Sequence, residues 1–158
     1  MTGPDSKPRP GESIRMHLLS TPWQLGVVRA AVEKICQQVG LDEKASGEVM
    51  LGVDEALTNV VRHAYEDAPD QPIDLEIALQ SDQAQGQSLR IVIRDHGRQV
   101  PLEDIRSRDL ADIRPGGLGV HIMQTCMDSV EFHPAEEGGT VLTMIKNIQT
   151  QQKESHQE

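Results

Sequence analysis

The chain has 158 residues and a formal net charge of -10. That length fits a single domain with its own core. The negative charge argues against a nucleic-acid partner, because nucleic acids are bound mainly by cations that face their phosphates. Only Trp23, Tyr65 and Phe132 are aromatic, so the core must be aliphatic. No apolar run approaches the roughly 20 residues of a membrane span, and the two cysteines form no CxxC pair, so we expect a reduced, cytoplasmic protein that does not associate with membranes.

The ends of the chain differ in composition from its middle. Residues 1–11 are polar and rich in Pro and Gly, and residues 148–158 are rich in Gln and Glu, so we expect two disordered tails around a domain at 12–147.

The expected elements are a strand at 12–20, a helix at 22–39 closed by Gly40, a helix at 48–65, strands at 72–80 and 88–95 joined by a hairpin connection at 82–88, a helix at 117–129, and strands at 129–134 and 139–147. This order predicts an α+β fold, a two-layer sandwich with helices on one face of a mostly antiparallel mixed sheet.

The helix at 48–65 carries the first candidate site. Its apolar positions step by three and four and form one stripe: Val49, Val53, Ala56, Leu57, Val60 and Ala64. Glu55 and Asn59 lie on a different face, four positions apart and hence about 6 Å from each other. Such a pair can supply a candidate general base and a ligand for a hard cation, although a solvated polar face is the simpler interpretation of this helix alone.

Two later segments also suggest chemistry. The strand at 88–95 ends in Asp95-His96-Gly97, which delivers an acidic side chain and a flexible residue to the strand end. The residues Gly116-Gly117-Leu118-Gly119 form a glycine-rich turn that opens the next helix. Unpaired backbone amides at a helix start attract phosphate. Taken singly, the first motif is better explained by an ordinary strand-ending turn and the second by a helix entry that binds nothing.

Taken in order, these three motifs resemble the Bergerat-type ATP-binding fold of DNA gyrase, Hsp90, histidine kinases and MutL. Within it the chain is most similar to the anti-sigma-factor serine kinases of the RsbW type. Their pattern of an acidic residue, Asn and His-Ala-Tyr is matched by Glu55, Asn59 and His63-Ala64-Tyr65. Their closing Gly-Gly-Thr is matched at 138–140, and the resemblance covers roughly residues 12–147.

The resemblance implies a role for each matching position at the phosphate end of a bound ATP. Asn59 would bind Mg²⁺ through its side-chain oxygen, which is a ligand type that this cation prefers. Glu55 would be the general base that takes the proton of the attacking hydroxyl. Gly117, Leu118 and Gly119 would contact the phosphates.

At the adenine end, the resemblance implies that Asp95 accepts a hydrogen bond from the adenine amino group. Guanine presents a carbonyl there, so this contact would discriminate between the two bases. Gly97 would let the backbone approach the base, since a β-carbon would crowd it. Thr140 would support the adenine. Neither His63 nor Tyr65 is assigned any chemistry.

The chain departs from the family pattern after Asp95. Many relatives continue D-x-G-x-G or D-x-G-x-x-F, whereas this chain continues Arg98-Gln99-Val100-Pro101. The resemblance places a lid over the nucleotide at 98–115, a segment with arginines at 98, 106, 108 and 114. These cations would either meet phosphate charge or remain solvated surface arginines.

The resemblance implies an ATP- and Mg²⁺-dependent serine protein kinase and anti-sigma factor. Such a protein phosphorylates a small antagonist protein, sequesters a sigma factor and forms a homodimer. One alternative is a nucleotide-gated binding module that sequesters a partner without kinase activity. Another is a domain that acts, as in histidine kinases, on a histidine of a partner.

Overall fold

A computed structural model describes residues 7–99 and 117–149 of the chain. Its five strands form one sheet in the order β1-β2-β3-β5-β4, and all four strand pairings are antiparallel. The strand bounds are β1 Ser13–Leu19, β2 Pro72–Asp82, β3 Gly86–Asp95, β4 Ser129–Pro134 and β5 Thr140–Ile148. The helices are α1 Pro22–Val39, α2 Glu43–Asn59, the π-helix η1 Val60–Ala64, and α4 Gly117–Cys126.

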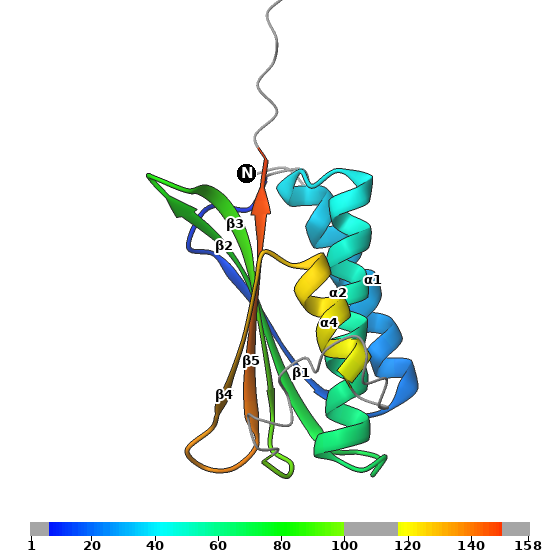
Figure 1. Ribbon diagram of the computed structural model, residues 1–158. Coiled ribbons are helices and arrows are strands. Elements are labelled where there is room, and N and C mark those ends of the chain that lie inside the picture. Colours follow the sequence, from blue (N-terminus) through cyan, green and yellow to red (C-terminus); the bar gives the residue numbers. More distant parts are fainter. Residues whose placement is uncertain (1–6, 100–116, 150–158) are drawn as a thin grey trace, which may run out of the picture.

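The helices lie together on one face of the sheet and leave the other face open (Figure 1). This arrangement confirms the predicted α+β, two-layer fold, although the described strands pair only antiparallel and the sheet is not mixed. Within the described residues, no helix combines the length and the apolar character that crossing a membrane requires.

The core lies between the sheet and the helix layer. Alternate residues of β2 and β3 face the helices, and this buried set comprises Ile73, Leu75, Ile77, Leu79, Leu89, Ile91 and Ile93. The predicted apolar stripe of the second helix is buried at every position, which confirms its assignment to the core. Burial of these aliphatic side chains supplies the main driving force for the fold.

The predicted helix at 48–65 differs from the structure at both ends. The helix already begins at Glu43, because the Asp42 side chain caps it by accepting a hydrogen bond from the Ala45 amide at 2.7 Å. From Val60 the helix widens into a π-turn, in which the Tyr65 amide donates to the Val60 carbonyl at 3.1 Å. Single π-turns of this kind are frequent at functional sites.

The other predicted elements agree with the structure to within a few residues. The connection between β2 and β3 shrinks to residues 83–85, and α4 ends at Cys126 rather than at residue 129. Of the predicted tails, residues 1–6 and 150–158 lie outside the described residues, as does most of the predicted lid at 98–115. The Gly11 amide donates to the Leu79 carbonyl, and Ile148 is the last residue of β5.

Candidate functional site

The glycine-rich start of α4 lies against the polar face of α2. A β-carbon on Gly119 would lie 2.9 Å from Glu55 Oε2 and 3.2 Å from Asn59 Oδ1. Glu55 and Asn59 are half-buried, and Gly119 is buried. Two motifs that are about 60 residues apart in the sequence therefore meet, and a side chain at position 119 would have to displace these oxygens.

This contact has the chemistry of a phosphate and magnesium site. It combines an amide oxygen and a carboxylate with the first turn of a helix, whose amides lack partners within the helix. The space that a β-carbon at Gly119 would fill is bordered by the Glu55 and Asn59 side chains. Hard cations prefer oxygen ligands of these types, so the residues present fit Mg²⁺. The Leu118 side chain is 60% exposed, so only its backbone has a place in this contact.

Asp95 is the buried acid at the end of β3, with 4% of its surface exposed. Its Oδ1 atom accepts a hydrogen bond from the Gly97 amide at 3.0 Å. Burial raises the pKa of the Asp95 carboxyl, while the amides of Gly97 and Thr140 and the charge of His96 oppose that rise. A buried carboxylate of this kind is suited to accept a hydrogen bond from a ligand.

Backbone packing fixes the turn that follows Asp95. A β-carbon on Gly97 would overlap the Ala64 carbonyl, and one on Gly139 would overlap the Asp95 carbonyl. Gly139 has a φ of 80°, which is strained for other residues. Gly97 is thus required by its contact with the end of η1, and the approach to a base that the resemblance implies stays a prediction. Thr140, which follows Gly139, is buried beside this turn.

Tyr65 takes part in the site although the sequence analysis assigned it no chemistry. Its hydroxyl accepts a hydrogen bond from the His96 amide at 2.8 Å and donates one to the Pro72 carbonyl. Burial raises the pKa of the Tyr65 hydroxyl, so it stays protonated and able to donate. The only signal for it in the sequence was its place in the His-Ala-Tyr pattern.

Of the predicted lid, Arg98 and Gln99 lie within the described residues. The Arg98 amide donates to the Ala64 carbonyl at 3.0 Å, and its guanidinium lies 3.6 Å from the Glu66 carboxylate. Both side chains are exposed, so this ion pair contributes little to stability. The predicted contacts of Arg106, Arg108 and Arg114 lie outside the described residues.

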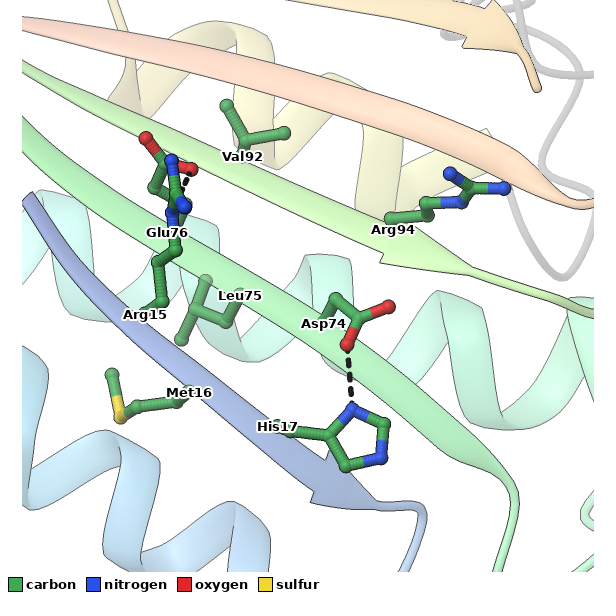
Figure 2. A pocket seen from close by; sticks show the side chains of 8 residues that line it. All are labelled: Arg15, Met16, His17, Asp74, Leu75, Glu76, Val92 and Arg94. Carbon is green, nitrogen blue, oxygen red and sulfur yellow. Dashed lines mark hydrogen bonds and ion pairs between the residues drawn. The ribbon is translucent and has the colours of Figure 1, made fainter.

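A separate hollow of about 410 Å³ lies on the open face of the sheet. Figure 2 shows its charged side chains standing on β1, β2 and β3, with Arg15 facing Glu76 and His17 facing Asp74. The hollow contains none of the predicted site residues, which lie on the helix side of the sheet or at its end. Asp74, which lines the hollow, also lies 2.7 Å from Nε2 of His96, the residue after Asp95.

Comparisons with known proteins agree with this geometry. A family model described as the histidine kinase-like ATPase domain matches residues 18–146. The chain is 31% identical over 146 residues to the serine-protein kinase RsbW of Halalkalibacterium halodurans. This match covers 87% of this chain and 85% of that protein. It is 28% identical over 153 residues to the serine-protein kinase RsbW of Listeria monocytogenes serovar 1/2a, which covers 92% of this chain and 93% of that protein.

A crystal structure of the RsbU and RsbW domains of a Mycobacterium tuberculosis protein has a similar fold. It matches with a TM-score of 0.62 and 19% identity, over 87% of this chain and 33% of that chain. The chain belongs to the histidine kinase-like ATPase domain family. Within that family it is of the RsbW type, as the motifs in its sequence predicted.

Proposed function

We propose that this protein is an ATP-dependent serine kinase that phosphorylates a small antagonist protein and, when that antagonist is scarce, sequesters a sigma factor. The observation that carries the proposal is the contact of Gly119 with Glu55 and Asn59. That contact brings a carboxylate, an amide oxygen and a helix start to one point. The names and identities of the relatives support the same activity.

At the phosphate end, Asn59 would hold Mg²⁺ through its amide oxygen, and the backbone at Gly117, Leu118 and Gly119 would contact the phosphates. The cation would neutralise phosphate charge when it is bound. The α4 helix begins at Gly117, so its free amides and its dipole add positive potential at the same place. These features let a chain of net charge -10 attract a triphosphate.

At the adenine end, the Asp95 carboxylate would accept a hydrogen bond from the adenine amino group. The turn held by Gly97 and Gly139 keeps this acid buried at the end of β3, and Thr140 lies beside it. A buried acceptor imposes a large penalty on a base that presents a carbonyl at that place. This arrangement would select adenine over guanine.

Glu55 would act as the general base. The serine oxygen of the antagonist attacks the γ-phosphorus, its proton passes to the Glu55 carboxylate, and ADP leaves with the electron pair of the broken P–O bond. Positioning and charge neutralisation supply most of the rate in such transfers, and a base contributes about 10²- to 10⁴-fold.

The remaining features of the proposal rest on the likeness to RsbW-type kinases. We infer a cytoplasmic homodimer that binds its antagonist and its sigma factor through protein surfaces. We infer no direct contact with nucleic acid, in keeping with the net charge.

Incubation with labelled ATP, Mg²⁺ and candidate antagonist domains tests the proposal. An acid-stable label on an antagonist serine is the expected result. A stable complex without label would instead indicate a nucleotide-gated binding module, and an acid-labile label would indicate transfer to histidine. Either of these results would overturn the assignment as a serine kinase, and Glu55→Ala serves as the negative control.

A further inference from the structure

The end of β3 directs two consecutive side chains to opposite faces of the sheet. Asp95 is buried on the helix side, where Leu89, Ile91 and Ile93 of the same strand also point. His96 follows it and is exposed on the open face. Because successive residues of an extended chain alternate in direction, a constraint on His96 also constrains the orientation of Asp95.

His96 is held at two atoms. Its amide donates to the Tyr65 hydroxyl at 2.8 Å, and its Nε2 atom lies 2.7 Å from Asp74 Oδ2. Tyr65 is only 7% exposed, and its hydroxyl also donates to the Pro72 carbonyl. The last register pair of β2 and β3 is Ile73 with Asp95, so the Tyr65 hydroxyl bridges the two strands one residue beyond the end of their ladder.

The contacts of His96 with Tyr65 and with Asp74 form a clamp on the end of β3. A further contact of Asp74 on the open face strengthens this clamp. Asp74 uses its second oxygen, Oδ1, to meet His17 Nδ1 at 2.6 Å, so one carboxylate of β2 joins a residue of β1 to the residue that follows β3. Figure 2 shows His17 and Asp74 facing one another across β1 and β2, with Arg94 standing on the neighbouring strand. The Tyr65 ring also limits the turn, because a β-carbon on Gly97 would lie 2.9 Å from its Cδ1 atom.

We propose that Tyr65 and Asp74 are positioning residues that act through His96 to orient the Asp95 carboxylate toward the amino group of adenine. This inference rests on the proposed function of Asp95. Hydrogen bonds weaken steeply when their geometry is lost, so a small rotation of the strand end would remove the contact while the pocket persists. The Tyr65 hydroxyl and the Asp74 carboxylate would thereby contribute to base selectivity without touching the nucleotide.

The test compares two nucleotides by calorimetry: ATP, and purine riboside triphosphate, which lacks the amino group. For Tyr65→Phe we expect ATP binding to weaken about fivefold, the equivalent of one ordinary hydrogen bond, while the analogue changes by less than about twofold. Equal weakening of both nucleotides, or no weakening of either, would overturn the inference. Purely structural damage would weaken both alike.

Two further variants sharpen the test. His96→Ala removes the imidazole that meets Asp74 on the exposed face, so it keeps the experiment decisive if Tyr65→Phe does not fold. We expect it to show the same selective loss for ATP. Arg15→Gln is the matched control, because Arg15 lies on the same open face but pairs with Glu76 rather than with Asp74 or His96. Its ATP affinity should equal that of the wild type, and a selective loss there would contradict a path through His96.

A double-variant cycle separates the positioning role of Tyr65 from the proposed adenine-binding role of Asp95. In an Asp95→Asn background the Tyr65→Phe change should have no further selective effect on ATP, because the group it positions is gone. An undiminished selective effect would show that Tyr65 acts by another route. If the wild type bound neither nucleotide, the proposed function itself would fail, and this inference with it.

Discussion

The two ends of the candidate site are built from different atoms. At the contact of α2 with α4, Gly119 is surrounded by the side-chain ends of Glu55 and Asn59, whereas at the end of β3 the neighbours of Gly97 and Gly139 are backbone carbonyls. Side-chain ends can rotate away at little cost, but backbone cannot. The phosphate end is therefore able to adapt to a ligand, while the adenine end is fixed by the fold.

The largest expected effect is a loss of phosphoryl transfer at the phosphate end of the site. Glu55→Ala should lower the rate of phosphoryl transfer by about 10²- to 10⁴-fold, because the general base is lost, while ATP binding persists. Single-turnover transfer from labelled ATP measures the rate, and calorimetry measures the binding. Glu33→Ala, which removes an exposed glutamate of α1, is the control. A normal transfer rate in Glu55→Ala would remove Glu55 from this role.

Two alanine substitutions compare the two ends directly. Gly139→Ala should lower the free energy of unfolding by about 2–4 kcal/mol, because φ is 80° and the new β-carbon meets the Asp95 carbonyl. Gly119→Ala should change it by less than about 1 kcal/mol, since a helical alanine is favourable and Glu55 can move. Urea denaturation measures both. Equal losses would mean that the two ends do not differ in rigidity.

Asp95→Asn should separate stability from binding. We expect ATP to bind more weakly by about 1.5–3 kcal/mol, because a charged acceptor is lost. Burial raises the pKa of the Asp95 carboxyl in the folded protein. Above that folded-state pKa, the buried carboxylate is ionised and lowers the stability of the fold. This loss of stability disappears as the pH falls below the unfolded-state pKa, where Asp95 is protonated in both states. The variant should therefore be more stable than the wild type at pH 7 and lose this advantage in acid. Unchanged ATP affinity by calorimetry would contradict the assignment.

The smallest effect is expected on the open face. A hydrogen bond from His17, followed in size by one from His96, lowers the pKa of the Asp74 carboxyl. The ionised form of Asp74 therefore stabilises the fold above the unfolded-state pKa. That stability is lost as the pH falls through the folded-state pKa. Because Asp74 is half-exposed, Asp74→Asn should cost only about 0.2–1 kcal/mol at pH 7. Thermal denaturation across the acid range should show the difference between variant and wild type shrinking, and a constant difference would argue against a charge effect.

The sequence predicted the parts of the fold that depend on local periodicity. The stripe from Val49 to Ala64 is buried, and β3 ends at Asp95, because spacing and strand-end chemistry specify both. The π-turn after Asn59 was not predicted, since one extra residue in a turn hardly changes an apolar pattern. The clamp at Tyr65 could not be predicted from spacing, because its hydroxyl partners depend on which strands meet beyond η1.

The contact of Gly119 with Glu55 and Asn59 lay between these cases. Each motif was visible in the sequence, but a solvated polar face explained Glu55 and Asn59 alone, and an ordinary helix entry explained the glycine-rich turn alone. Only their resemblance in order to known ATPases predicted that they act together. The structure adds the reason for the glycine, which is the space that two oxygen-bearing side chains occupy.

A crystal structure with a non-hydrolysable ATP analogue and Mg²⁺ would show whether the nucleotide occupies both ends of this site. We predict the adenine amino group within hydrogen-bonding distance of the Asp95 carboxylate, with the triphosphate beside Gly119 and the cation on the Asn59 oxygen. A nucleotide bound elsewhere, or a protein that takes up none from millimolar analogue, would contradict this prediction.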